Sequence, residues 1–135
     1  MAKTISKLKK ELDKWFSLYI RLREADDLGF VKCHTSGRYY HYKNIHAGHF
    51  MSRKHLSTRW CEINVQPQSA ADNLYGQGQQ YRFGLNLDAK YGIGTADELE
   101  IKSKKTEKFT RVDYEEKISY YKKFVKNLKK QKNLE

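Results

Sequence analysis

Apolar side chains recur at three- and four-residue spacing near both ends of the chain, which is the period of an amphipathic helix. Residues 3–27 are predicted to form an N-terminal helix that stops before Gly29. A second stripe predicts a C-terminal helix that begins near Asp113. The first stripe consists of Leu8, Leu12, Trp15, Tyr19 and Leu22, widened by Phe16 and Ile20, and the second of Tyr114, Ile118, Tyr121, Val125 and Leu128.

The middle of the chain has a different pattern. Residues 30–66 mix aromatic, β-branched and histidine residues with turn formers, which is typical of short strands. We expect Phe30–Cys33 to pair with Tyr39–Tyr42, and Ile45–Met51 to form a hairpin with Arg59–Val65. Pro67 should end the last of these strands, because proline has no N–H to donate.

Helical signals return after Pro67. We expect a short helix over residues 69–74, a break at Gly76–Gly78, a helix of about a dozen residues closed by Gly92, and another that starts with a capping box at Thr95. The pattern therefore predicts an α+β fold in one domain spanning residues 1–135. Its parts are the N-terminal helix (3–27), a mixed core (28–92) and a basic helical extension (93–135).

Length and charge limit the function. A chain of 135 residues is too short for a multi-domain enzyme, and its 27 Lys and Arg against 16 Asp and Glu give a net charge of +11. Such a charge suits a polyanionic partner, because lysine and arginine release condensed counterions from phosphates. No apolar run is long enough to cross a membrane and no signal peptide is evident, so we expect a cytoplasmic protein.

Four of the five histidines, His41, His46, His49 and His55, fall within 15 residues of one another. Histidine can accept a proton near neutral pH and can bind metals. His49, Asn64 and Asn73 follow in that order on a strand, its partner strand and the next helix. Such an arrangement can surround one divalent cation, and phosphodiester cleavage needs a base together with a metal.

Four ordered segments carry a specific resemblance. The segments are WFSLYIRLR (15–23), AGHF (47–50), RWCEINV (59–65) and PQ followed by Asn73, and they resemble the NinG/Rap family of phage recombination proteins. The similarity runs from about Lys14 to about Glu100. That family belongs to the HNH, or His-Me finger, nucleases. The resemblance implies a ββα-metal core with the terminal helices packed around it, in a phage-encoded protein of the bacterial cytoplasm.

The resemblance also implies an activity and assigns roles. It implies a metal-dependent endonuclease that cuts branched double-stranded DNA such as Holliday junctions and forks, with one Mg²⁺ or Mn²⁺ per site. His49 would be the general base, Asn64 would hold the His49 imidazole, and Asn73 would bind the metal. The plain alternatives are a strand-end turn residue for Asn64 and a helix cap for Asn73. Gly48 stands where many HNH nucleases have an acidic ligand, and we hypothesise that His46 on the same strand face helps fill that role.

Relatives carry two Cys-x-x-Cys knuckles that bind a structural zinc. The corresponding positions here are Cys33, Ser36, Ser69 and Asp72, which form a poor tetrahedral ligand set. We therefore expect structural zinc to be absent, with packing and hydrogen bonds joining these positions instead. Cys33 and Cys61 are expected to be free thiols or remnants of a metal site.

Several cations are candidates for DNA binding. Arg53 follows His49 by four residues and would act as a phosphate clamp or be an exposed loop charge. Arg21 and Arg23 would contact phosphate or brace the domain through Glu24 or Asp26. The remaining candidates are Arg59 and, on the basic C-terminal helix, Lys122 and Lys126.

Two other functions fit the same residues. One is a catalytically inactive binder of branched DNA, which Gly48 and the missing zinc ligands suggest. The other is a module that contacts phage or host recombination proteins through Tyr114, Tyr120 and Tyr121. Symmetric cleavage of a four-way junction would call for a homodimer, and the C-terminal stripe suits either a dimer interface or packing within the chain.

Overall fold

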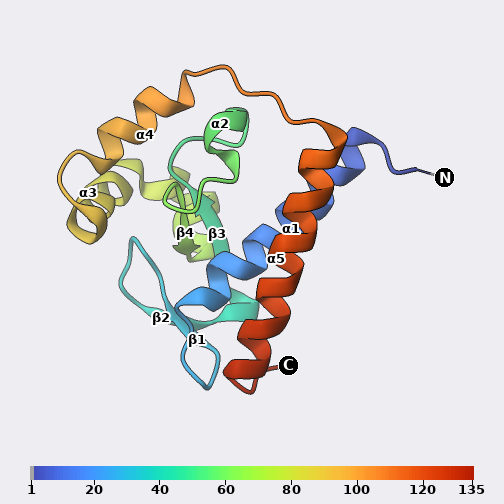
Figure 1. Cartoon of the computed structure of the whole chain (residues 1–135). Coiled ribbons are helices and arrows are strands. Elements are labelled where there is room, and N and C mark those ends of the chain that lie inside the picture. The colour runs from blue at the N-terminus through green and yellow to red at the C-terminus, as the bar shows by residue number, and fades with distance from the viewer. Residues whose placement is uncertain (1) are drawn as a thin grey trace.

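The computed structural model describes residues 2–135, in which two long helices lie side by side and run in the same direction (Figure 1). Helix α1 spans Ile5–Arg23 and begins at Thr4, whose hydroxyl accepts a hydrogen bond from the Lys7 N–H at 3.1 Å. The apolar stripe of α1 is buried as expected, with its most enclosed side chains at Leu8, Leu12, Phe16, Ile20 and Leu22.

Helix α5 spans Arg111–Gln131 and covers α1. It begins at Thr110, three residues before the expected start, because Thr110 and Asp113 form a reciprocal capping box. Its stripe packs against α1, and the Phe16 and Tyr121 rings meet edge to face at 4.9 Å. The C-terminal stripe is therefore intramolecular packing. Tyr114 and Tyr121 are buried, so of the three tyrosines expected to contact a partner only Tyr120 is exposed.

Two small antiparallel sheets form the middle of the chain. In the first, β1 (Phe30–Lys32) pairs with β2 (Tyr39–His41), which confirms that hairpin. After the single turn η1 (Tyr42–Asn44), β3 (His46–His49) pairs with β4 (Val65–Gln68).

The partner strand of β3 lies further along the chain than the sequence predicted. Pro67 is inside β4, opposite Ala47, rather than beyond its end. A two-stranded sheet tolerates proline because each strand has a free edge. The Pro67 carbonyl oxygen also accepts a hydrogen bond at 2.7 Å from the N–H of His34, which lies in the turn between β1 and β2.

Residues 59–64 do not form the expected strand. Helix α2 (Leu56–Arg59) and a following turn occupy this part of the chain. The reason is Asp13 of α1, whose carboxylate accepts hydrogen bonds from both Arg59 and Trp60. Neighbouring side chains of a strand point to opposite faces, so a strand would not direct both residues to one carboxylate.

The remaining helices follow β4. They are two single turns and two α-helices. The turns are η2 (Ala71–Tyr75), a wide turn of π-helix, and η3 (Gln77–Gln79), a turn of 3₁₀-helix, and the α-helices are α3 (Gln80–Tyr91) and α4 (Thr95–Ser103). Gly92 closes α3 as predicted. The capping box at Thr95 does not form, because α4 begins at Gly94 and Asp88 of α3 accepts the Ala96 N–H at 2.9 Å. In residues 2–135, no helix combines the length and the apolar character that a membrane crossing requires.

The four positions of the expected knuckles come together between the two sheets. Cys33 Sγ accepts hydrogen bonds from the backbone N–H of Ser69 at 3.2 Å and of Ser36 at 3.4 Å. The Thr35 hydroxyl donates to Asp72 at 2.6 Å. Burial raises the pKa of the Cys33 thiol, but the hydrogen bonds from Ser36, Ser69 and Thr35 outweigh burial and lower it to about 7. Hydrogen bonds thus join these positions, as the sequence predicted.

Asp72→Ala should lower the free energy of unfolding by about 1 to 3 kcal/mol, because the Thr35 hydroxyl loses a charged acceptor. Urea unfolding followed by circular dichroism measures this effect. Asp27→Ala, at an exposed position, is the control. Equal stabilities of the two variants would show that the Asp72 contact does not support the fold.

Candidate functional site

A cleft of about 680 Å³ lies between α1, β3, η2 and the loop after β3. His46 and His49 line it from β3, Asn73 from η2, Arg53 from the loop and Asp13 from α1. Strand β3 packs against α1 (Figure 1). Residues Asp13, Phe16, Ser17 and Arg21 of α1 line the cleft. The structure therefore brings three of the four predicted catalytic and metal-binding residues to one hollow, and only Asn64 lies outside it.

The His49 imidazole is held by a backbone carbonyl. Its Nε2 lies 2.9 Å from the carbonyl oxygen of Arg59. A carbonyl oxygen can only accept, so Nε2 carries the proton, and in the neutral ring Nδ1 keeps a free lone pair. This tautomer is the one that a general base needs.

Burial keeps the His49 imidazole neutral. It lowers the pKa of His49 from its ordinary value of 6.5 to about 4, against the opposing effect of the hydrogen bond to Arg59. The positive charge of Arg53 lowers this pKa further, whereas Asp13 raises it. At neutral pH the ring is therefore able to accept a proton.

Asn64 does not hydrogen-bond to His49, which corrects the predicted role. Its fully buried amide accepts the Met51 N–H at 2.8 Å and donates to the carbonyl oxygens of Met51 and Thr58, both at 3.0 Å. These bonds close the loop between β3 and β4. Asn64 therefore affects His49 only indirectly. It holds the segment that carries the Arg59 carbonyl, and this carbonyl binds His49.

Asp13 is the residue of this site that the sequence analysis missed. It forms a bidentate ion pair with Arg59, with distances of 2.6 and 3.2 Å, and accepts the Trp60 indole N–H at 3.0 Å. These contacts fix α2 against α1 beside the cleft. The available signal was an acidic residue at the edge of the apolar stripe of a basic helix, but nothing in the sequence indicated its partners.

His46 and Asn73 meet in the cleft. The Asn73 side-chain Nδ2 lies 3.2 Å from His46 Nδ1, so the amide donates to the ring. The two residues predicted to bind a metal are therefore adjacent. The wide turn η2 makes this possible, since it presents Asn73 toward β3 directly after β4.

The side chain of Gln68 explains the glycine at position 48. A β-carbon on Gly48 would overlap Gln68 Oε1 and would lie 2.9 Å from Gln68 Cβ. Gln68 is fully buried and donates to the Gly78 carbonyl at 2.7 Å, so it has little room to move. An acidic ligand at position 48 is therefore sterically excluded in this fold.

The donor set decides which ion fits. Among residues 2–135 there is no group of three or more His, Cys, Asp or Glu placed to hold a metal. Asn73 offers an amide oxygen, a donor type that suits Mg²⁺ or Mn²⁺, and His46 offers an imidazole, a donor type that suits transition metals better than Mg²⁺. Structural zinc fits poorly at the Cys33 cluster, where the thiol and Asp72 already have hydrogen-bond partners.

Most of the predicted DNA-binding arginines support the scaffold. Arg59 pairs with Asp13, and Arg23 donates to the carbonyl oxygens of Glu62 and Val65, both at 3.0 Å. Arg21 donates to the Tyr42 carbonyl at 2.7 Å. Arg21 and Arg23 thus brace the domain mainly through backbone carbonyls. The expected partners for this role were Glu24 and Asp26.

Those of the predicted DNA-binding cations that are exposed lie in two places. The Arg53 side chain is 64% exposed at the cleft, only 4.0 Å from Asp13, and stays the best candidate for a phosphate clamp. Lys43 lines the same cleft. Lys122 and Lys126 are exposed on α5 away from it, and their contact with DNA stays a prediction.

A family model, described as the bacteriophage lambda NinG protein, matches residues 1–132. The chain belongs to the NinG family. This match places it among phage proteins in a recombination-related context. Searches of curated proteins and of solved structures find no match.

In this NinG-family chain, Gly48→Ala should reduce stability by about 1 to 3 kcal/mol, because the new methyl group overlaps the Gln68 carboxamide. Thermal unfolding measures the effect. A second substitution, Gln68→Ala, should restore part of the loss in the double variant. An unchanged stability of Gly48→Ala would show that Gln68 is not the constraint.

The unfolding free energy of this NinG-family chain should fall as pH drops from about 6.5 to about 4. In that window unfolded His49 binds a proton and folded His49 does not, so acid favours the unfolded state. His34, whose pKa is also lowered by burial, adds to the slope. Denaturant unfolding across this range should show a smaller slope in His49→Gln, and an identical slope would contradict the buried neutral ring.

Proposed function

We propose that this protein is a metal-dependent endonuclease that acts on branched DNA. The observation that carries the proposal is the neutral His49 imidazole, whose Nε2 is bound to a carbonyl and whose Nδ1 is free. It lines a cleft that also contains the adjacent pair His46 and Asn73. A base and a metal-binding pair in one basic cleft suit phosphodiester hydrolysis.

The residues divide the chemistry between them. His49 Nδ1 takes a proton from water as the water oxygen attacks phosphorus. The bond from phosphorus to the leaving oxygen breaks, and this oxygen takes a proton from solvent. Mg²⁺ or Mn²⁺ bound beside His46 and Asn73 would supply stabilisation of the charge that develops on phosphate. Asp13 and Asn64 position the Arg59 carbonyl that orients the base.

Substrate binding helps His49 act as a base. A pKa of about 4 makes the free imidazole a weak base. A phosphate brought into the cleft adds negative charge next to the ring and favours its protonated form, which raises the pKa toward the working range.

The charge of the cleft favours a phosphate backbone. Arg21, Lys43 and Arg53 line it against the single carboxylate of Asp13. Backbone contacts of this kind carry no sequence information. Selection would therefore depend on the shape of the DNA, as is appropriate for forks and four-way junctions.

The test is a cleavage assay with linear, forked and four-way DNA in Mg²⁺ or Mn²⁺, with a chelator control. We expect metal-dependent cutting of the branched substrates and a loss of about 10² to 10⁴-fold in His49→Ala. The matched control is His55→Ala, which removes a histidine outside the cleft. His46→Ala and Asn73→Ala should need more metal for the same rate.

A catalytically inactive DNA-junction binder is the second candidate, favoured by Gly48 at the position of an acidic ligand and by the finding that residues 2–135 contain no group of three or more His, Cys, Asp or Glu placed to hold a metal. Tight binding of four-way DNA without cutting under any metal would support this candidate and refute the nuclease. Equal cutting by wild-type protein and His49→Ala would also refute the assigned base.

A further inference from the structure

Three large apolar side chains are open to solvent within a short stretch beside the cleft. Leu74 and Tyr75 end the turn η2, and Tyr81 belongs to the first turn of α3. Their exposed fractions are 60%, 86% and 79%. We call these three side chains the apolar tip. Leu74 also lines the cleft, so the tip begins at the edge of the candidate site.

A tight turn joins the two parts of the apolar tip. The N–H of Gln79 donates to the carbonyl oxygen of Gly76 at 3.0 Å, and both residues between them have positive φ. The chain therefore reverses direction, which brings the segments that carry Tyr75 and Tyr81 together. Exposed apolar side chains gathered in this way indicate a binding surface.

Backbone hydrogen bonds fix the support of the apolar tip. The fully buried side chain of Gln68 donates to the Gly78 carbonyl oxygen at 2.7 Å. The N–H of Gly76 donates to the Ala71 carbonyl oxygen at 2.8 Å. The tip is thus presented to solvent on an ordered turn, which lowers the entropy that binding has to cost.

The apolar tip lies between two basic hollows. The first is the cleft, which Gln80 lines at the start of α3, and the second is a hollow of about 660 Å³ that Arg82 lines two residues later. The charged side chains of the second hollow are three cations and one carboxylate: Lys32, Arg82, Lys90 and Glu24. Lys90 pairs with Glu24, so Lys32 and Arg82 remain to attract phosphate.

This arrangement matches a branch point of DNA. Each arm of a branched duplex carries its own phosphate backbone, and a basic hollow on either side of the tip can hold one arm. Within a continuous duplex every base pair is covered by its neighbours. Where arms meet, the terminal base pairs expose a face, on which aromatic rings stack and beside which apolar side chains insert.

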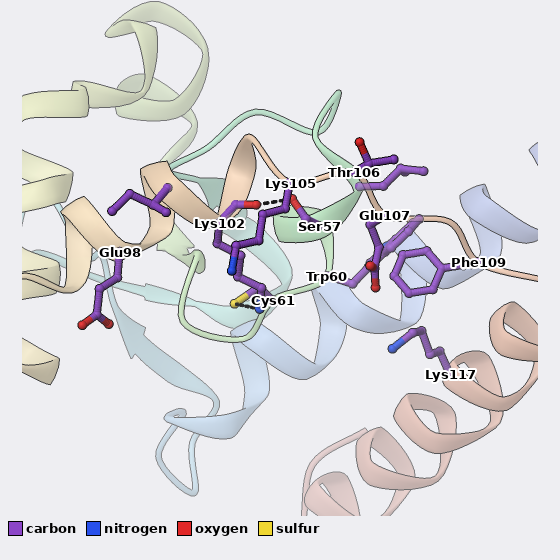
Figure 2. A pocket seen from close by; sticks show the side chains of 12 residues that line it. Ser57, Trp60, Cys61, Glu98, Lys102, Lys105, Thr106, Glu107, Phe109 and Lys117 are labelled. Carbon is purple, nitrogen blue, oxygen red and sulfur yellow. Dashed lines mark hydrogen bonds between the residues drawn. The ribbon is translucent and has the colours of Figure 1, made fainter.

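A third hollow, between α2, α4 and the linker of residues 104–110, lacks these features. Its Trp60 ring is buried and has the Arg59 guanidinium 4.9 Å from its centre. Figure 2 shows Lys117 beside the Phe109 ring, with its ammonium 5.1 Å from the ring centre. Aromatic rings open to a base are therefore a property of the apolar tip and not of this hollow.

We propose that the apolar tip recognises the branch point of DNA, with one arm held in the cleft and another along the second hollow. Tyr75 and Tyr81 stack on the base-pair faces that are open where the arms meet, and Leu74 fills the space beside them. The inference rests on the proposed function, because the cleft has to bind a DNA arm, but it does not depend on cleavage.

The experiment measures binding by fluorescence anisotropy in chelator, so that no cleavage intervenes. The probes are a labelled four-way junction and a linear duplex with the same number of base pairs. We expect the wild-type protein to bind the junction more tightly. Tyr75→Ala and Tyr81→Ala should each weaken junction binding at least about fivefold and leave duplex binding unchanged, because only the branch point offers a face for stacking. Tyr75→Phe, which keeps the ring, should bind like the wild-type protein.

The chain offers matched controls. Tyr39→Ala removes a ring that is 66% exposed on β2 and does not line either basic hollow, so it should bind both DNAs like the wild-type protein. Ile101→Ala, in the third hollow, is the corresponding control for Leu74→Ala. Unchanged junction binding by the two tyrosine variants, or an equal loss on both DNAs, would overturn the proposal. Equal binding of junction and duplex by the wild-type protein would overturn it as well.

The cleavage assay separates this proposal from the nuclease proposal. Selective loss of junction binding in Tyr75→Ala, in a protein that cuts no DNA, refutes the nuclease alone. Cutting that requires both metal and His49, with unchanged junction binding by Tyr75→Ala and Tyr81→Ala, refutes the role of the apolar tip alone.

Discussion

The hydrogen bond between the His49 imidazole and the Arg59 carbonyl is the interaction on which the candidate site depends. It fixes the ring and its tautomer, and it leaves Nδ1 unprotonated in a residue that lines the cleft. The carbonyl is in turn held in place by Asp13 through the Arg59 side chain and by Asn64 through Thr58. One helix and one loop thus cooperate to orient a single base.

Steric and hydrogen-bonding constraints around β3 limit which residues could serve the proposed metal site. Gln68 fills the space beside Gly48 and leaves no room for an acidic ligand there. Asp72, held by Thr35, anchors the start of η2, and this turn brings Asn73 to His46. The result is a neutral pair of donors, which leaves most of an ion's coordination to water and phosphate.

Periodic and local features were predictable from the sequence. The buried stripe of α1, the hairpin of β1 and β2, and the end of α3 at Gly92 depend on spacing and turn chemistry that the chain displays directly. The order His49, Asn64, Asn73 predicted that His49 and Asn73 would share a site, and His46 was added to it as a hypothesis; these three line the cleft, whereas Asn64 lies outside it.

Features set by distant partners were not predictable. The stretch from Arg59 to Val65 has strand composition, yet Asp13, 46 residues before Arg59, draws Arg59 and Trp60 into a helical turn. Asn64 has the residue type of a ring-orienting partner, but its contacts are decided by loop closure at Met51. Likewise, the start of α4 depends on Asp88 in another helix.

The most direct test of the account is NMR of the histidine rings and side-chain amides while Mn²⁺ is added. Paramagnetic broadening falls steeply with distance from the ion, so it locates the binding site without any assumption about activity. The account predicts that His46 and Asn73 signals broaden first, with His49 next and His55 unaffected. Equal broadening of His55 and His46, or none at either residue, would contradict a metal site in this cleft.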